Sequence, residues 1–305
     1  MRQRRRPAGA FRLHKPVLLE TVLSYLKLKP GDIVLDGTVG SGGHAEAILR
    51  AIQPAGFLIG LDQDEEAIKR VQNRLETVGG RFILQQLNFR YFEQALSSLH
   101  VKRLNAVLLD IGVSSDQLEN PERGFSIQHD GPLDMRMDQR EIQTAATFVA
   151  QATEDELFTI FREYGEERFA SRIARVIIRE RDKEPIQRTV QLKQLAERVV
   201  PGRYRFGRIH PATRIFQALR IAVNDELGAL NEFLPKAFDC LELGGKLAII
   251  SFHSLEDRIV KYFFRDQAQA GKGKLITKKA IKPADEEIVE NPRSRSAKLR
   301  VIERG

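Results

Sequence analysis

The 305-residue chain has no tryptophan and only one cysteine, Cys240. A lone cysteine excludes an internal disulfide framework and fits a reducing compartment. The sequence also has no apolar run of about 18 residues and no signal-peptide pattern, so we expect a cytoplasmic protein that does not enter a membrane. A chain of this length buries roughly three quarters of its unfolded surface, and a core of that size needs no cross-links.

Acidic side chains are missing from two segments of this basic chain. The first 15 residues hold six basic side chains and no acid, and residues 201–224 hold five arginines interleaved with Tyr204, Phe206 and Phe216. A third basic block lies between residues 272 and 300. Such blocks suit a phosphate backbone, and aromatic rings stack on unpaired bases. Three blocks favour a nucleic-acid partner, although each alone is equally compatible with solvated surface charge.

Strand-like apolar runs alternate with helical patterns from residue 17 to residue 110. The expected order is helix Val17–Leu28, strand Ile33–Asp36, helix Gly43–Ala51, strand Phe57–Asp62, helix Glu65–Thr77, strand Arg81–Gln86, helix Tyr91–Leu99 and strand Ala106–Asp110. This alternation predicts an α/β fold in which helices cover both faces of a parallel sheet.

The alternation stops between residues 116 and 209, where we expect only helices. They are Glu154–Glu163, which begins with a Thr153–Glu156 capping box, Glu167–Arg181 and Val190–Val200. We therefore expect a helical domain at 116–209, inserted into a discontinuous sheet domain formed by residues 1–115 and 210–305.

The sheet is expected to resume in the last hundred residues. Predicted elements are a long helix Ala212–Asp239, strand Lys246–Ser251, helix Leu255–Gln267 with a start signal at Ser254 and Asp257, and a hairpin of Lys274–Thr277 with Lys298–Glu303. We expect the basic loop 278–297 to be mobile. A parallel sheet that ends in an antiparallel hairpin resembles the methyltransferase arrangement more than that of a dinucleotide dehydrogenase.

The glycine-rich segment after the first predicted strand indicates a cofactor site. Strand Ile33–Asp36 ends in a carboxylate and leads through Gly40, Gly42 and Gly43 into a helix. Glycines let the backbone approach a ligand closely, and an acid at the end of the second strand, Asp62, is suitably spaced to hold ribose hydroxyls. The segment therefore predicts an adenosine-bearing cofactor.

Residues 40–45 also satisfy the dinucleotide pattern G-x-G-x-x-G/A, which is weak evidence alone. A dinucleotide would place pyrophosphate at the helix start, where Asp36 adds like charge. S-adenosylmethionine carries no phosphate and has a cationic ammonium and sulfonium. Three carboxylates at the carboxyl ends of strands, Asp36, Asp62 and Asp110, favour that cationic cofactor.

The position of Cys240 restricts which atoms can accept the methyl group. Methylation of a pyrimidine ring carbon generally needs a thiolate that first adds to the ring. Cys240 lies at an apolar helix end without a basic neighbour, which is typical of packing rather than nucleophilic attack. The acceptor is then an oxygen or nitrogen, and an exocyclic base amine is a fair candidate.

Eight segments resemble one family, the MraW-type ribosomal RNA small-subunit cytosine-N(4) methyltransferases. They are residues 14–20 (HKPVLLE), 36–44 (DGTVGSGGH), 110–118 (DIGVSSDQL), 123–126 (RGFS), 130–138 (DGPLDMRMD), 210–214 (HPATR), 250–258 (ISFHSLEDR) and 291–297 (NPRSRSA). The resemblance implies a Rossmann-like class I methyltransferase sheet with a helical insert. It also implies S-adenosylmethionine-dependent methylation of a cytosine amine in the decoding region of 16S ribosomal RNA, within the small ribosomal subunit.

The resemblance also implies which residues contact the cofactor. They are Gly42, Gly43, His44, Asp62, Phe89, Asp110 and Gln117. Two departures from the family pattern, Val39 and Ala45, leave the glycines intact.

The catalytic residues are a hypothesis of their own, because Asp110-Ile111-Gly112-Val113 replaces the Asp/Asn-Pro-Pro-aromatic turn of many amine methyltransferases. We expect Ser251, Phe252 and His253 to help hold a flipped base beside Asp110. His253 is equally compatible with a helix cap.

Several alternatives remain open at this point. One is a DNA amine methyltransferase, another is a nicotinamide dehydrogenase, and a third is a non-catalytic RNA-binding assembly factor. His129, Asp130, Asp134 and Asp138 form a conceivable metal cluster, but their spacing matches no recognised ligand pattern, so we predict no metal. The oligomeric state is not specified by the sequence.

Overall fold

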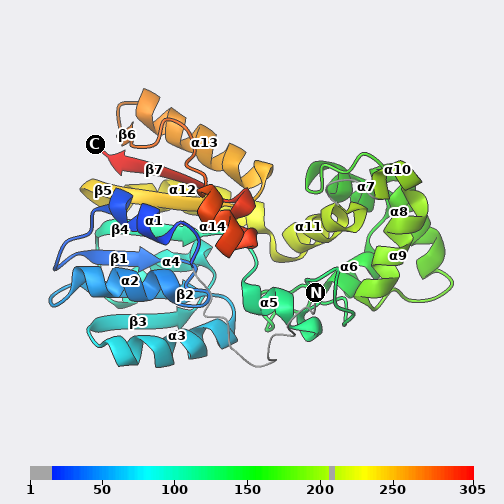
Figure 1. Cartoon of the computed structure of the whole chain (residues 1–305), viewed down its shortest axis with the longest axis horizontal. Coiled ribbons are helices and arrows are strands. Elements are labelled where there is room, and N and C mark those ends of the chain that lie inside the picture. Colours follow the sequence, from blue (N-terminus) through cyan, green and yellow to red (C-terminus); the bar gives the residue numbers. More distant parts are fainter. Residues whose placement is uncertain (1–15, 206–209) are drawn as a thin grey trace, which may run out of the picture.

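The computed structural model describes residues 16–205 and 210–305 of the chain (Figure 1). The basic arm before residue 16 and residues Phe206 and Arg208 of the second basic block lie outside these residues. No helix among the described residues has both the length and the apolar character needed to cross a bilayer.

One sheet of seven strands organises the described residues. The strands are β1 Ile33–Asp36, β2 Phe57–Asp62, β3 Arg81–Gln86, β4 Leu104–Asp110, β5 Leu241–Ser251, β6 Gly273–Leu275 and β7 Lys298–Arg304. Their order is β3-β2-β1-β4-β5-β7-β6. The first five pair in parallel, whereas β7 runs antiparallel to both β5 and β6. The predicted parallel sheet with an antiparallel hairpin is confirmed.

Helices cover both faces of this sheet. One face packs α1 Leu19–Leu26, α2 Gly43–Ile52 and α3 Glu65–Val78, and the other packs α4 Phe92–Ser98, α12 Glu226–Asp239 and α13 Ser254–Gln269. Alternation along the strands produces this division, because Val34 faces the first set and Leu35 the second. Each helix therefore has a buried apolar stripe and a solvated face.

A second group of helices lies beside the sheet (Figure 1). It comprises α5 Ser115–Glu119, η2 Pro121–Arg123, α6 Ala145–Gln151, α7 Glu154–Glu163, α8 Ala170–Arg181, α9 Thr189–Val199, α10 Gly202–Arg205 and α11 Pro211–Asn224. These helices share a separate hydrophobic core that includes Phe161, Ile177 and Leu192. The expected capping box at Thr153 and Glu156 begins α7. Between residues 115 and 205 no described residue belongs to a named strand.

The predicted long helix Ala212–Asp239 is wrong, because Asp225 interrupts it. The backbone of Asp225 is left-handed, with a φ of 47°, and separates α11 from α12. Residues Ile215, Phe216 and Leu219 of α11 pack into the core of the second helical group, whereas α12 packs on the sheet. The expected domain boundaries remain a prediction, and this packing favours a boundary near Asp225 over one at residue 210.

The region after β5 also differs from expectation. The predicted loop 278–297 contains α14 Asp285–Glu290 and the short turn η3 Pro292–Ser296. Glu287 of α14 accepts a hydrogen bond from the amide of Leu18 at 2.7 Å, so this segment packs back onto the start of α1. Helix α13 begins at Ser254, one residue before its predicted start at Leu255. Its N-cap is His253 rather than Ser254, and Glu256 completes the capping box.

Candidate active site

A cavity of about 330 Å³ lies at the carboxyl ends of the parallel strands. The sheet and the second helical group share its wall. Asp62 and Asp110 end strands β2 and β4, whereas Gln117 comes from α5 and Arg220 from α11. Open α/β sheets bind ligands at this edge, and the volume suits a small organic cofactor.

The glycine-rich turn brings its backbone close to neighbouring segments. Gly40 and Gly42 have φ values of 50° and 84°, which disfavour any residue with a Cβ. Gly43 has no positive φ, but a Cβ there would overlap the ring of Pro16. Gly42 is the N-cap of α2 and packs towards Val71 of α3. Of the seven predicted cofactor residues, Gly42 alone does not line the cavity.

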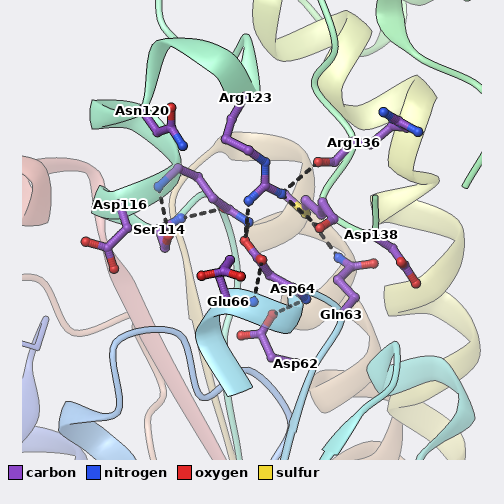
Figure 2. Close-up of polar contacts among 12 residues, drawn as sticks. Asp62, Gln63, Asp64, Glu66, Ser114, Asp116, Asn120, Arg123, Arg136 and Asp138 are labelled. Atoms are coloured by element: carbon purple, nitrogen blue, oxygen red, sulfur yellow. Dashed lines mark hydrogen bonds and ion pairs between the residues drawn. The ribbon is translucent and has the colours of Figure 1, made fainter. Parts of the chain in front are cut away.

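Asp62, at the end of β2, holds the glycine-rich turn, and Figure 2 shows it beside Asp64. Its Oδ2 accepts a hydrogen bond from the amide of Gly40 at 2.9 Å, and its Oδ1 accepts one from the amide of Asp64 at 2.9 Å. Burial raises the pKa of Asp62 to about 6, against the opposing effect of those hydrogen bonds. Each carboxylate oxygen keeps a lone pair for a further donor such as a ribose hydroxyl.

Two more carboxylates end strands β1 and β4. Asp36 is fully buried, and burial raises its pKa to about 7. Asp110 lines the cavity, and burial together with the charges of Asp36 and Glu256 raises its pKa to about 8. Among the described residues, Asp36 Oδ2 and Asp110 Oδ1 have no hydrogen-bond partner. Three crowded, desolvated acids favour a ligand that carries positive charge.

Three further residues from the predicted cofactor set, His44, Phe89 and Gln117, line the cavity. His44 Nε2 lies 3.7 Å from Asp110 Oδ2. Phe89 is buried and packs its ring edge-on against Phe233, with centroids 5.3 Å apart, so the cavity wall is rigid here. Gln117 completes the capping box of α5, and its Nε2 donates to Asp64 Oδ2 at 2.8 Å.

The predicted catalytic residues occupy different environments. Asp110 and Phe252 line the cavity, whereas Ser251 and His253 are not among its lining residues. Ser251 is buried in β5. His253 Nε2 lies 3.0 Å from Glu256 Oε1, and the amide of Phe252 donates to Glu256 Oε2 at 2.8 Å. His253 therefore acts as a helix cap whose partner also holds Phe252.

Sequence reasoning missed an ion pair on the cavity wall, formed by Arg220 of α11 and Glu226 of α12. Arg220 Nε and Nη2 donate to the two carboxylate oxygens of Glu226 at 2.7 and 2.9 Å. Burial opposes the charge of Arg220, but Glu226 and Glu256 raise its pKa above the usual value. The only local signal is that Arg220 belongs to the basic block 201–224 and that Glu226 is the second of two acids, after Asp225, that follow this block in the sequence.

Two groups of acids bear on metal binding. Glu226, His253 and Glu256 each have a ligand atom within 4.8 Å of the others, but the guanidinium of Arg220 already neutralises Glu226. In the second group Asp130 pairs with Arg188, Asp134 with Arg136 and Asp138 with Arg140. Arginines therefore occupy these carboxylates, and the prediction of no metal remains a prediction.

Comparisons with known proteins place the chain among methylases. The model of the MraW methylase family matches residues 12–305. The chain is 48% identical to ribosomal RNA small subunit methyltransferase H of Syntrophotalea carbinolica, covering 95% of this chain and 98% of that protein. It is 47% identical to the protein of the same name from Heliobacterium modesticaldum, with the same coverage. A solved rRNA methylase from Streptococcus thermophilus is 12% identical, with a TM-score of 0.45 over 93% of this chain and 92% of that one.

Proposed function

The chain belongs to the MraW methylase family, and from that premise we propose that it methylates the N(4) amine of a cytosine in the decoding region of 16S ribosomal RNA. Family membership already makes it an S-adenosylmethionine-dependent ribosomal RNA methyltransferase. The proposal adds the base, the atom and the position, and it takes the small ribosomal subunit, in the cytoplasm, as the partner.

The cavity suits S-adenosylmethionine in shape and in charge. That cofactor supplies a methyl group bonded to a positively charged sulfur. Gly43 leaves no room for a side chain beside Pro16, and the hydrogen bonds from Gly40 and Asp64 fix Asp62 for the ribose. Asp110 and the buried Asp36 favour the cationic portion of the ligand. His44, Phe89 and Gln117 complete the proposed cofactor contacts.

An amine acceptor is supported by the absence of a usable thiol. Cys240 is the C-cap of α12 and does not line the cavity. Burial raises the pKa of its thiol. A ring carbon would need a thiolate, whereas an amine attacks directly. Bound S-adenosylmethionine would supply an electrophilic methyl group that such an amine nitrogen can attack without prior activation by a thiolate.

We assign the pyrimidine to the side of the cavity that holds Asp110, Phe252 and Arg220. Ionised Asp110 accepts a hydrogen bond from the amine and increases its nucleophilicity. Arg220 Nη1 has no hydrogen-bond partner among the described residues, and it suits the O2 and N3 acceptors of cytosine. Uracil has a hydrogen on N3 and no amine. Ser251 and His253 then act through Phe252, which they flank.

The observation that carries the proposal is the combination of an acid-lined cavity with the absence of cysteine from its described walls. The test incubates the protein with tritiated S-adenosylmethionine and small subunits, free 16S RNA or DNA, followed by mass spectrometry of the nucleosides. We expect N(4)-methylcytidine from ribosomal RNA. A preference for DNA would support a DNA amine methyltransferase, and cofactor binding without transfer to any substrate would support an assembly factor.

A further inference from the structure

A buried ion pair joins the connection between β2 and α3 to the second helical group (Figure 2). Arg123 Nη1 donates to Asp64 Oδ2 at 2.6 Å, and the two side chains are 7% and 5% exposed. Asp64 follows β2 by two residues, and Arg123 ends η2. Gln117 Nε2 donates to the same oxygen of Asp64 at 2.8 Å. A buried pair with these contacts holds both segments in one fixed relation.

The opposite side of the Arg123 guanidinium holds a wall of the cavity. Arg123 Nη2 donates to the carbonyl oxygens of Arg136 and Met137, each at 3.0 Å. Met137 lines the cavity, and its sulfur lies 3.1 Å from Gln63 Nε2. The amide of Met137 donates to Asn224 Oδ1 at 2.7 Å. Arg123 therefore fixes Met137 over the same cavity that Asp62 enters from the sheet.

Asp64 connects Arg123 to the proposed ribose acceptor. Its amide donates to Asp62 Oδ1 at 2.9 Å, while its own Oδ1 accepts from the amide of Glu66 at 3.1 Å and caps α3. A shift of the Asp64 carboxylate would therefore move the amide that orients Asp62. This two-residue connection is short and fully hydrogen-bonded, so displacement at one end is transmitted to the other.

We propose that Arg123 is a positioning residue for the cofactor, which it acts on through Asp64 and Met137 without touching it. This inference rests on the proposed placement of the ribose at Asp62. It makes the second helical group a functional part of the cofactor site, because Arg123 and Met137 both belong to the segment after β4.

The chain offers a matched control in Arg136. Arg136 pairs with Asp134 through Nε–Oδ1 and Nη2–Oδ2 contacts of 2.7 Å, and it also donates to loop carbonyls. It lies in the same segment as Met137 but does not line the cavity or contact residues 62–64. Replacing Arg136 by methionine removes a comparable ion pair without removing the connection to Asp62.

The experiment measures binding of S-adenosylhomocysteine and its 2′-deoxy counterpart by calorimetry. The proteins are the wild type, Arg123→Met, Arg123→Lys and Arg136→Met, each checked by thermal melting. We expect Arg123→Met to weaken S-adenosylhomocysteine binding about tenfold, the size typical of coupled neighbours. The loss should shrink to about twofold with the 2′-deoxy ligand, since the contact that Arg123 orients is already missing. Arg136→Met should leave both affinities within about twofold of the wild type, because the ion pair it removes is not connected to Asp62 through hydrogen bonds of its side chain.

Three results would distinguish a failure of the inference about Arg123 from a failure of the ribose placement at Asp62. An unchanged affinity in folded Arg123→Met overturns the inference, and so does an equal loss for both ligands. A wild type that does not discriminate between the ligands overturns the ribose placement at Asp62 itself. Should Arg123→Met not fold, Arg123→Lys gives the same comparison, because lysine keeps the charge at Asp64 but cannot bridge to the two carbonyls.

Discussion

Proton release on cofactor binding is the sharpest consequence of the acidic cavity. Asp110 has a pKa of about 8 without a ligand, so at pH 7 about nine tenths of the molecules carry a proton there. A cationic ligand favours the ionised form, and binding at pH 7 should therefore expel about 0.9 proton from this site. Asp110→Asn keeps the shape of the side chain but cannot ionise, so this contribution should vanish.

The same linkage sets the pH dependence of affinity. The ionised fraction of Asp110 grows as the pH rises towards 8, and the contribution of this group to the binding constant should increase about 50-fold between pH 6 and pH 8. Asp36 and Asp62 also titrate near this range, and the cofactor has its own amino group. The informative quantity is therefore the difference between the wild type and Asp110→Asn, in which the other contributions largely cancel.

Calorimetry of S-adenosylmethionine binding in two buffers with different ionisation enthalpies measures the number of protons released. Repeating the titrations at pH 6, 7 and 8 gives the affinities. Equal proton release by the wild type and Asp110→Asn, with parallel pH profiles, would refute the reasoning, because Asp110 would then not sense the charge of the ligand.

Three further predictions concern stability and turnover. Native Asp36 retains a proton between its unfolded pKa of 3.8 and about 7, so the free energy of unfolding of the wild type should fall as the pH rises through that window. Asp36→Asn escapes this loss, and its free energy of unfolding relative to the wild type should increase by about 4 kcal/mol by pH 8, measured by urea unfolding without cofactor. A pH-independent difference would contradict burial as the cause. Gly43→Ala forces Pro16 away from α2 and should weaken cofactor binding at least tenfold in equilibrium dialysis, a change of about 1.4 kcal/mol. An affinity of Gly43→Ala equal to that of the wild type would show that the turn adapts to the added methyl group. His253→Ala should destabilise the start of α13 by about 1 kcal/mol and lower single-turnover methylation more than cofactor affinity, because the cap and its partner Glu256 hold Phe252. His253→Asn, a good cap, should restore both, and an unchanged rate in His253→Ala would show that the cap does not act on the site through Phe252.

Strands and their order are the most predictable part of the fold. The bounds of β1, β2 and β3 match the predicted ranges Ile33–Asp36, Phe57–Asp62 and Arg81–Gln86. Each is a short apolar run between turn-forming residues, so local sequence alone defines it. In contrast β5 begins at Leu241, ahead of the glycine pair that marks its predicted start, because pairing with Leu104 of β4 holds the extra residues.

The failures have tertiary causes. The apolar pattern of residues 212–239 is typical of a helix on both sides of Asp225. The local sequence does not indicate that α11 and α12 pack against different hydrophobic cores. The left-handed backbone of Asp225 is held by an ion pair between its carboxylate and Arg90, which is remote in sequence. The charge of segment 278–297 predicts a mobile loop, yet Glu287 caps a backbone amide at the start of α1.

The candidate site is predictable where function imposes a local pattern. Six of the seven residues expected to contact the cofactor line the cavity, among them His44 and Phe89, and their contacts with the cofactor stay a prediction. Arg220 and Asn224 belong to no local pattern of this kind, and the motif that contains Met137 does not indicate that this side chain reaches the cavity, because the approach of all three depends on how the second helical group docks. The periodicity of apolar residues shows which face of a helix is buried but not which residues of another element that face contacts.

The neighbouring strands β4 and β5 are separated in the chain by residues 111–240. During synthesis, β4 must therefore wait for the whole helical segment to emerge before its partner exists. Until then one edge of β4 is open, although its residues Val107 and Leu109 are fully buried in the finished fold. An unpaired apolar strand edge can pair with another chain, so we expect the nascent chain to be most prone to association while this segment is being translated.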